Sequence, residues 1–327
     1  LTGYAKNCAA IYVEKGEHIV IRNCDLHDCG NGLFCAHQTT DLLVEGNRLY
    51  DCGNVGSAYE HNNYTEALGI VFQYNYFGPP KAGADGNNLK DRSAGLVVRY
   101  NWIEGGNRQL DLVDSDYSSL IDDPSYRSTF VYGNILVEPD GAGNSQILHY
   151  GGDSGDQSRY RKGTLHFFNN TVISERSGNT TLMRLSSDGE SADCRNNILY
   201  VTAGGNKLAM MNQDGSLYMA DNWLKSGWID SHSGGSIDIT DTGQITGNDP
   251  GFVDFGSADF QLLEGSACID TGGALAGAVL PDHRPLREYV PHNGVRDRPV
   301  AGEIDIGAYE YSPAVAVHSM PHRRLFL

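Results

Sequence analysis

The chain has 327 residues and a formal net charge of −17 at pH 7, from 24 Lys and Arg against 41 Asp and Glu. Nucleic acids and anionic membrane surfaces attract proteins through basic patches, so this balance argues against both as partners. An acidic polysaccharide stays compatible with it if Lys, Arg or a divalent cation is concentrated at one site. No stretch is long enough to span a membrane.

Forty glycines and many short runs rich in Val, Ile, Phe and Tyr, bounded by Gly, Asn and Asp, predict strands and turns. An asparagine recurs in one setting, after a short apolar strand and before two more strand-like residues, as in VRYNWI. The eight positions are Asn23, Asn47, Asn75, Asn101, Asn134, Asn170, Asn197 and Asn222, at intervals of 24, 28, 26, 33, 36, 27 and 25 residues between successive numbers. Such a repeat, lengthened only by insertion, is typical of a solenoid.

The amide of asparagine has both donors and an acceptor, so a buried copy in each coil can bond the backbone and the next amide. These positions therefore predict an asparagine ladder. Asparagine also tolerates the left-handed backbone of a sharp turn. Each repeat has the length of three short strands and three turns, which predicts an all-β fold, a single-stranded right-handed parallel β-helix.

With these repeats the chain resembles the pectate-lyase-like superfamily of right-handed parallel β-helix proteins, over roughly residues 9 to 230. The resemblance implies a secreted bacterial protein, extracellular or periplasmic, that acts on polysaccharides. The chain begins at Leu1 on a complete repeat without a signal segment, so we expect N-terminal residues to precede it. We expect a monomer with a β-helix in residues 1–230, an end and capping segment in 231–311, and a loose tail in 312–327.

The region after Asn222 and the cysteines are interpreted as structural. Segments 247–273 and 296–311 resemble a closing segment of secreted β-helix proteins and are expected to cover the last coil. Their charged residues predict structural ion pairs, namely Asp270, Arg298, Asp305 and Glu310. Seven cysteines show no metal-finger spacing. Cys29 and Cys52, each in a DCG triplet, are expected to stack on neighbouring coils as a disulfide or as buried free thiols.

Four segments that precede the asparagine strands align with one another and give the candidate site. They are NNYTE (62–66), NNLKD (87–91), RQLDL (108–112) and QILHY (146–150). Because side chains alternate along a strand, we expect one set to point inward, namely Tyr64, Leu89, Leu110 and Leu148. We expect the next residue of each segment to point outward in one column, namely Thr65, Lys90, Asp111 and His149.

Further polar residues are expected around this column. A second outward column is predicted from Asn63, Asn88 and Gln109. The predicted substrate-binding residues are this second column with Arg99, Arg108 and Asp153. The adjoining turns are expected to hold His61, Glu66, Arg92, Asp114 and Asp153. The insertions 115–127 and 151–162, which account for the two longest intervals, are expected to wall the site.

Coils about 4.8 Å apart would bring Lys90, Asp111 and His149 to one sugar residue. β-Elimination from a uronic-acid polymer needs a base for the C5 proton, a cation for the carboxylate and an acid for the leaving oxygen. The resemblance implies such a lyase, with Lys90 as base and Arg92 as carboxylate partner or acid. Lys90 then needs a lowered pKa, which Arg92 or a bound cation would provide. His149, and Tyr64 with His61 as an acid and base pair, are further catalytic candidates.

Alternatives stay open at the level of the sequence. Asp111, Asp114 and Asp116 offer oxygen ligands suited to Ca²⁺, with Glu66 as a further candidate ligand, although the spacing of the aspartates matches no EF-hand loop. A glycoside hydrolase would use Asp111 with Asp114 or Asp153. A C5-epimerase shares the proton abstraction, and a β-helix that only binds glycans needs no chemistry. Lys90 could also be a solvated lysine paired with a neighbouring aspartate. The aspartate cluster and arginine motif of the pectate lyases proper are missing, so the polymer is left open.

Overall fold

The structure, a computed structural model, describes residues 3–212, 214–233, 237–292 and 294–313. Within them it is an all-β protein with few helical turns. The helical turns are α1 (Ser118–Ile121), η1 (Pro124–Arg127), η2 (Gly205–Lys207), η3 (Phe255–Ser257) and η4 (Gly277–Val279). The expected tail lies almost wholly outside these residues, from 314 onward.

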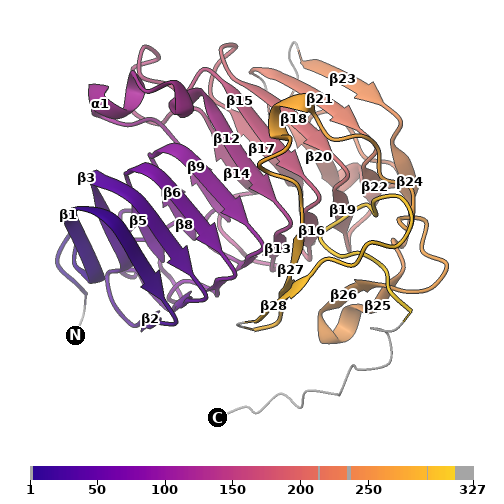
Figure 1. Cartoon of the computed structure of the whole chain (residues 1–327), viewed down its shortest axis with the longest axis horizontal. Helices are drawn as coiled ribbons and strands as arrows, with labels where there is room; N and C mark the ends of the chain where they lie inside the picture. Colours follow the sequence, from indigo (N-terminus) through magenta and orange to yellow (C-terminus); the bar gives the residue numbers. More distant parts are fainter. Residues whose placement is uncertain (1–2, 213, 234–236, 293, 314–327) are drawn as a thin grey trace.

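Parallel strands form three rows that the chain visits in turn, and we call one pass through the rows a coil (Figure 1). The first row contains β5 (Asn63–Thr65), β8 (Leu89–Asp91), β11 (Leu110–Leu112), β14 (Gln146–Tyr150), β17 (Thr180–Leu185) and β20 (Leu208–Met211). The second row contains β6 (Leu68–Gln73), β9 (Ala94–Arg99), β12 (Ser128–Tyr132), β15 (Thr164–Phe168), β18 (Ser191–Arg195), β21 (Ser216–Ala220) and β23 (Asp238–Thr242). Two long strands, β1 (Ala9–Arg22) and β3 (Asn31–Glu45), join both rows into one 15-stranded sheet.

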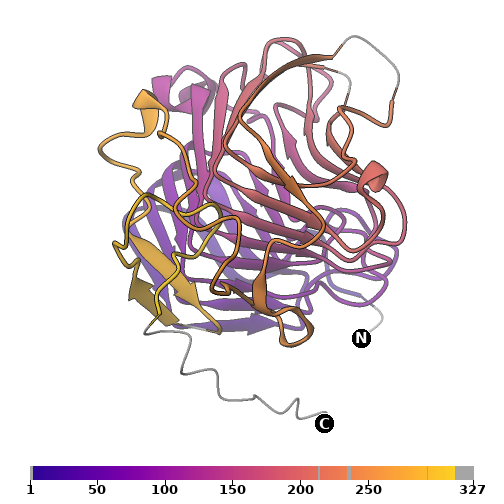
Figure 2. The ribbon, with the colours of Figure 1, turned by 90° about the vertical axis from the view of Figure 1, so that its right-hand side faces the viewer.

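The third row is a separate nine-stranded sheet. It contains β2 (Asp25–His27), β4 (Arg48–Tyr50), β7 (Tyr76–Phe77), β10 (Trp102–Glu104), β13 (Ile135–Glu138), β16 (Thr171–Ser174), β19 (Ile198–Val201), β22 (Trp223–Lys225) and β24 (Ile245–Gly247). The later coils lie in front of the earlier ones when the molecule is viewed from one end (Figure 2). These long parallel sheets are consistent with a parallel β-helix-like solenoid.

Equivalent inward positions of successive coils lie side by side and form one apolar core. Leu33, Asn63, Leu89, Leu110, Leu148 and Met183 occupy one such line in the first row. The leucines and the methionine of this line belong to a single buried cluster that runs through the coils. Alternation along short strands therefore leaves the opposite side chains of the first row for the outer surface.

A row of buried amides runs along the inside of the coils. From Asn47 to Asn222, the Nδ2 of each asparagine donates to the Oδ1 of the next at 2.9 to 3.1 Å. The row continues from Asn222 Nδ2 to Gln244 Oε1 at 2.9 Å. The same Nδ2 also donates to a backbone carbonyl of the preceding coil, as from Asn47 to Ile21. Each buried amide therefore finds the partners that burial of a polar group requires.

The placement of Asn23 in this row is wrong by one residue. The backbone N–H of Cys24, rather than that of Asn23, donates to Asn47 Oδ1 at 2.9 Å, as the N–H of Asn47 does to Asn75 Oδ1. Asn23 instead has a φ of 56° and precedes the row, like Gly46 with a φ of 64°. The left-handed conformation therefore belongs to the residue before the amide row.

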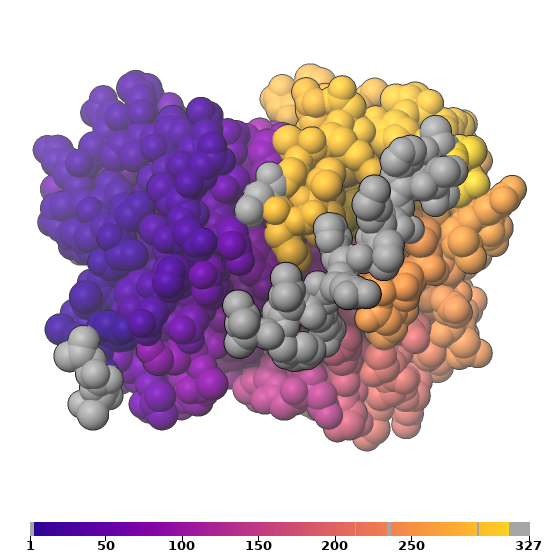
Figure 3. All heavy atoms as spheres, turned by 90° about the horizontal axis from the view of Figure 1, so that it is seen from below, coloured from indigo at the N-terminus to yellow at the C-terminus, as the bar shows by residue number. Residues whose placement is uncertain are grey.

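The C-terminal segment packs along the outside of the third row. Its two antiparallel pairs are β25 (Phe252–Asp254) with β26 (Asp259–Leu262), and β27 (Arg287–Val290) with β28 (Gly294–Asp297). Apolar residues from several coils, Trp102, Ile135, Ile173, Ile198 and Trp223, pack against Phe252, Phe260, Tyr289 and Ile306. Figure 3 shows the later part of the segment in gold on the surface of the molecule. It thus covers the flank of five coils and not only the last one.

The charged residues of this segment have structural partners. Arg298 Nε lies 2.9 Å from Glu310 Oε2 in a buried ion pair. The Asp305 carboxylate accepts the backbone N–H groups of Asp270 and Tyr311 at 2.6 and 2.5 Å. The prediction of ion pairs is thus confirmed for Arg298 and Glu310, whereas Asp270 contributes its backbone. Cys29 and Cys52 are free thiols whose Sγ atoms lie 3.4 Å apart.

Candidate functional site

The outer surface of the first row carries one column of polar and aromatic side chains. Its members are Phe34, Tyr64, Lys90, Asp111, His149 and Arg184, which pair in register from β3 to β17. The prediction that Thr65 belongs to this column is wrong, because Tyr64 and not Thr65 pairs with Lys90. Thr65 is buried and donates to Asp91 at 2.7 Å. Tyr64, expected to point inward, is therefore an outward, half-buried residue.

The predicted second outward column is also wrong. Asn63, Asn88 and Gln109 have no exposed surface. Asn63 lies in the inward line and donates to Thr65 Oγ1 at 2.9 Å. Asn88 Oδ1 accepts a hydrogen bond from Asn62 at 2.9 Å, and Gln109 donates to Glu138. These side chains bond other residues inside the coils, although Asn63 Oδ1 and Gln109 Oε1 have no hydrogen-bond partner, and they leave no surface for a substrate.

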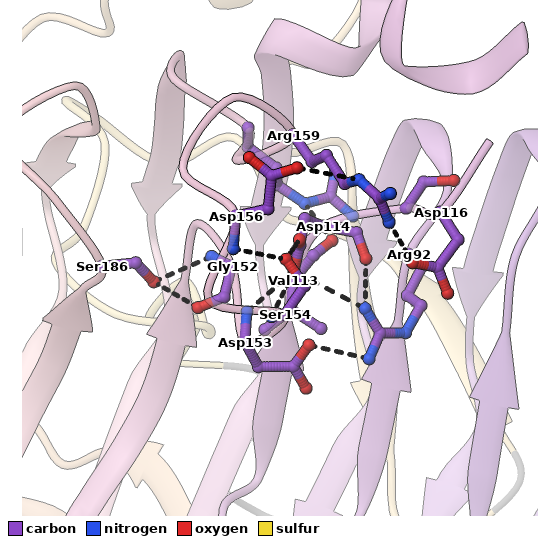
Figure 4. A network of polar contacts seen from close by, with 12 residues as sticks. Arg92, Val113, Asp114, Asp116, Gly152, Asp153, Ser154, Asp156, Arg159 and Ser186 are labelled. Carbon is purple, nitrogen blue, oxygen red and sulfur yellow. Dashed lines mark hydrogen bonds and ion pairs between the residues drawn. The ribbon is translucent and has the colours of Figure 1, made fainter. Parts of the chain in front are cut away.

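Lys90 and Arg92 hold the carboxylate of Asp153 between them. They are the residues immediately before and after Asp91, which ends β8. Lys90 Nζ lies 2.6 Å from Asp153 Oδ2, and Arg92 Nη2 lies 2.8 Å from Asp153 Oδ1. Each oxygen of Asp153 thus faces a different cation, and Figure 4 shows the contact with Arg92. We call Lys90 and Arg92 the cation pair.

Asp153 reaches the cation pair because Asp114 holds the backbone of its loop, the 151–162 insertion. Asp114 Oδ1 accepts the backbone N–H groups of Asp153 at 2.7 Å and of Ser154 at 3.3 Å. Arg159 of the same insertion pairs with Asp116 of the 115–127 insertion at 2.7 Å (Figure 4). The two insertions therefore meet above the edge of the first row, where the sequence places the walls of the site.

The charges of the site are strongly coupled. Burial lowers the pKa of Lys90, but Asp111 at 2.5 Å and Asp153 outweigh it, so this pKa is raised. In this arrangement Lys90 therefore lacks the lowered pKa that a base needs near neutral pH. Burial would raise the pKa of Asp111, yet Lys90 and His149 hold it well below its usual value. The pKa of Asp153 is likewise lowered, against its burial, by Lys90 and Arg92.

Tyr64 and His61 form a second group beside the cation pair. Arg92 Nε donates to the Tyr64 hydroxyl oxygen at 3.0 Å. The rings of His61 and Tyr64 meet edge to face with centroids 5.4 Å apart. His61 Nδ1 accepts the backbone N–H of Asn87 at 2.9 Å, which leaves the ring proton on Nε2. Burial, with Lys90 nearby, lowers the pKa of His61 to about 3, so the ring is neutral at neutral pH.

His149 lies between two partners from neighbouring coils. Its Nδ1 is 2.8 Å from Asp111 Oδ1, and its Nε2 is 2.8 Å from Ser186 Oγ. Burial lowers the pKa of His149, and Asp111 only partly opposes this. A neutral imidazole with Nδ1–H donating to Asp111 is the form that these contacts favour. Ser186 is a site residue that the sequence did not single out.

The proposed metal ligands do not come together. Among residues 3–212, 214–233, 237–292 and 294–313, no three or more His, Cys, Asp or Glu are grouped so that they could hold a metal ion. Asp111 faces Lys90 and His149, and Asp114 holds the 151–162 insertion. Glu66 accepts the Ser115 hydroxyl at 2.5 Å, and burial raises its pKa. The residues named for Ca²⁺ thus do not fit a common site, and no chemical step is derived through one.

The two other arginines predicted to bind substrate, Arg108 and Arg99, lie on different faces of the molecule. Arg108 borders the column, where it donates to Gln146 Oε1 at 2.7 Å and lies 4.0 Å from Asp111. Arg99 is on the second row, and it bonds Gln73 at 2.8 Å and Tyr132 at 3.1 Å. Arg99 is therefore on another face and does not belong to the site.

The chain was also compared with known proteins. No protein-family model matches it, and neither a curated protein nor a solved structure is significantly similar to it. None of the helices in the described part of the chain is long and apolar enough to cross a membrane. The residues of the first row are therefore the basis on which a function is inferred.

Proposed function

We propose that this protein is a secreted polysaccharide lyase that cleaves a uronic-acid-containing polysaccharide by β-elimination. In this proposal the three rows with their buried amides are a right-handed parallel β-helix with an asparagine ladder, and the outer surface of the first row binds the polymer. The observation that carries it is the cation pair, which binds both oxygens of one carboxylate.

A carboxylate between a lysine and an arginine is held by charge-assisted hydrogen bonds, which are stronger than neutral ones. Asp153 occupies this place, and a uronate carboxylate has the same shape and charge. When the uronate replaces Asp153, Lys90 and Arg92 neutralise its charge. Neutralisation stabilises the negative charge that develops when the C5 proton leaves. We therefore assign Lys90 and Arg92 to binding the carboxylate.

Tyr64 is the proton-transfer group in this proposal. In its deprotonated form the Tyr64 oxygen, to which Arg92 Nε donates, takes the C5 proton. The electron pair forms the C4–C5 double bond, and the C4–O bond breaks. The phenol then returns the proton to the leaving oxygen, so that Tyr64 is regenerated. His61, neutral and with its proton on Nε2, packs against the Tyr64 ring.

A glycoside hydrolase is less well supported by the same residues. Hydrolysis needs one protonated carboxyl as the general acid beside an ionised one. Asp111 and Asp153 both have lowered pKa values, so neither provides the acid. A C5-epimerase would share the proton abstraction but would leave the C4–O bond intact, and a glycan-binding protein would do neither.

The test is to mix the protein with a panel of polyuronates, with added Ca²⁺ and with chelator, and to follow ultraviolet absorbance. The unsaturated uronate that only elimination produces absorbs strongly, so a rise establishes a lyase and names its substrate. New reducing ends without absorbance would assign a hydrolase instead. C5 inversion without cleavage would assign an epimerase, and binding alone would leave a glycan-binding protein.

A further inference from the structure

Three side chains from successive coils lie in one hydrogen-bonded line. Asp111 of β11 holds Nδ1 of His149 of β14 at 2.8 Å, and Nε2 of His149 lies 2.8 Å from Ser186 Oγ, just after β17. Asp111 and His149 are buried, whereas Ser186 is half-buried at the edge of the first row. The elimination proposed above makes no use of Ser186.

We infer that Ser186 is the nucleophile of a second activity of this protein, the hydrolysis of carboxylic esters. A serine becomes a nucleophile when a base lies within hydrogen-bond reach and a third group orients that base. His149 is the base, and Asp111 is the residue that positions it. The order of carboxylate, imidazole and hydroxyl is recognised by its geometry and is independent of the fold that carries it.

The chemistry balances with water as the only co-reactant. Ser186 Oγ attacks the ester carbonyl carbon, and its proton passes to His149 Nε2. The tetrahedral intermediate collapses as the carbon–oxygen bond to the alcohol breaks, and His149 gives the proton to the leaving alcohol. Water, deprotonated by His149, then hydrolyses the acyl-serine, which releases the carboxylic acid and regenerates the hydroxyl.

The surroundings of Ser186 offer a donor for the developing negative charge. The backbone N–H of Gly152 points at Ser186 Oγ from 2.8 Å (Figure 4), within reach of an oxygen on the attacked carbon. Arg184 follows His149 in register on the same outward column. An acyl group carried by an anionic polymer would therefore find positive charge beside the serine.

A merely structural serine would not need this line. The contacts of Ser186 Oγ with the N–H of Gly152 at 2.8 Å and with the carbonyl oxygens of Gly152 and Tyr150 at 3.0 and 3.2 Å are enough to fix the start of the 151–162 insertion, and they do not involve His149. The neighbouring Ser187 shows the contrast, because its hydroxyl donates to Glu190 Oε2 at 2.6 Å. Ser187 is thus the matched control. It is the next serine in the chain, but its hydroxyl bonds a carboxylate and is not part of the line through His149.

A fluorophosphonate probe, which modifies serine nucleophiles activated by a base, tests the inference on the unmodified protein. We expect one covalent adduct, found by fragmentation of the tryptic peptide 185–195 on Ser186 rather than on Ser187 or Ser191. Hydrolysis of p-nitrophenyl acetate should fall at least a hundredfold in the labelled protein. Absence of an adduct on Ser186, or ester hydrolysis that survives complete labelling, would overturn the inference.

Variants give a second measurement. Ser186→Ala should lose both labelling and ester hydrolysis, and Ser187→Ala should keep both. His149→Asn should lose labelling while its melting temperature is compared with that of the parent protein. Should Ser186→Ala not fold, the adduct on the unmodified protein still decides. Failure of the polyuronate assay does not affect this result, because the ester probe needs neither a uronate nor the cation pair.

Discussion

The carboxylate of Asp153 competes for the two cations that a uronate would use. Both of its oxygens are engaged, at 2.6 Å by Lys90 and at 2.8 Å by Arg92. Its side chain is nevertheless 32% exposed, in contrast to 3% for Asp111. Asp153 is therefore the partner of the cation pair that a ligand arriving from solvent reaches first.

Replacement of Asp153 by Asn should strengthen binding of a polyuronate. The amide keeps the size of the side chain and removes the competing charge, so we expect KM to fall about threefold to tenfold. The decrease in KM should be larger at low salt, where charges are screened less. KM at two salt concentrations measures this. Asp156→Asn, in the same insertion but exposed and bonded to Ser158 at 2.6 Å, is the control. An unchanged KM in Asp153→Asn would refute the competition.

The hydroxyl of Tyr64 should be needed for turnover but not for binding. Tyr64→Phe keeps the ring, which packs edge to face on Phe34 at 5.2 Å. We expect kcat to fall about 10²- to 10⁴-fold, the usual contribution of a positioned proton-transfer group, with little change in affinity. Tyr12→Phe, in the same outward column and 50% exposed, should keep full activity. Comparable kcat in both variants would move proton transfer to another residue.

His61 should make the protein sensitive to acid. Its pKa is about 3 in the folded protein against 6.5 for the free side chain, so below pH 6.5 the unfolded state binds a proton that the native state does not. The stability present above pH 6.5 is lost as the pH falls toward 3. In His61→Asn, whose Oδ1 can accept the Asn87 N–H, we expect this loss to shrink by about 2 to 4 kcal/mol.

Denaturant unfolding at several pH values measures this difference. His18→Asn is the control, because His18 is 79% exposed and Asp41 raises its pKa. It should not make unfolding less sensitive to acid. Parallel stability curves for the parent and His61→Asn would show that His61 is not the group involved.

Alternation predicts part of the column from the sequence. Lys90, Asp111 and His149 each follow a buried leucine, so alternation alone places them together. Two adjacent asparagines at 62 and 63 both offer an alignment with Asn88. The strand register, which pairs Asn63 with Leu89, and the hydrogen bond from Asn62 to Asn88 decide between them. This ambiguity is the reason for the one-residue error that placed Thr65 where Tyr64 lies.

At the scale of elements, the buried amide row ties each coil to the next. An interior member such as Asn134 donates through Nδ2 to Asn170 Oδ1 at 3.0 Å and to Val98 O at 2.9 Å, and its Oδ1 accepts from Asn101. Loss of this amide therefore removes hydrogen bonds from partners in two neighbouring coils, among them the backbone N–H of Asn101, which donates to Asn134 Oδ1 at 2.9 Å. The cost of buried unsatisfied groups exceeds the net contribution of the bonds themselves.

Asn134→Ala should lower the free energy of unfolding by about 2 to 4 kcal/mol, because several buried partners each lose a hydrogen bond. Thermal and denaturant unfolding measure the change. Asn206→Ala removes an exposed asparagine outside the row and should be close to neutral. Equal stabilities for the two variants would mean that the row contributes no more than a surface residue.

The interval between asparagines was enough to predict stacked coils, but not which residue of each turn enters the row. Asparagine suits both the amide row and the left-handed position before it, and Asn23 takes the second place with a φ of 56°. Cys24 and Gln244 stand at the two ends of the row, where an asparagine pattern gives no signal. Partners of the backbone decide such cases, and a sequence does not show them.

At the scale of the whole molecule, the C-terminal segment joins coils that otherwise touch only their neighbours. Phe260 stacks on Trp102 with centroids 5.6 Å apart and meets Phe252 at 5.3 Å. The same buried cluster extends to Trp223, several coils later. Proteins built of stacked repeats usually unfold with little coupling between distant repeats, and we expect this packing to add such coupling.

Phe260→Ala should destabilise the protein by about 3 to 5 kcal/mol, the usual cost of emptying a buried phenylalanine site. Hydrogen exchange should also show weaker protection in β10 through β22, because the flank of these strands loses its cover. Leu263→Ala, at a position that is 50% exposed, is the control. Exchange that rises only within the C-terminal segment would contradict the coupling.

The parts of the site that come from outside the coils escape prediction from sequence. Asp153 belongs to an insertion, which has no equivalent in the repeat. Ser186 follows β17, which lies beyond the four segments that the sequence aligns, and its equivalent in the preceding coil is Gly151, which has no side chain. Their positions depend on Asp114 and Gly152, contacts that link residues 34 to 39 apart in the chain. The period of the repeat predicts the platform, and the insertions complete it.

The place of the C-terminal segment in the chain also determines when the flank of the coils is buried during synthesis. Coils stack on earlier coils as they emerge, but Trp102, Ile135 and Trp223 wait for residues 252–311 before their outer faces leave water. At about 5 to 20 residues per second, the stripe beginning at Trp102 stays bare for on the order of ten seconds. A growing chain therefore exposes this apolar stripe until residues 252–311 have packed onto it, and a chaperone that recognises exposed apolar surface would bind the protein before that point.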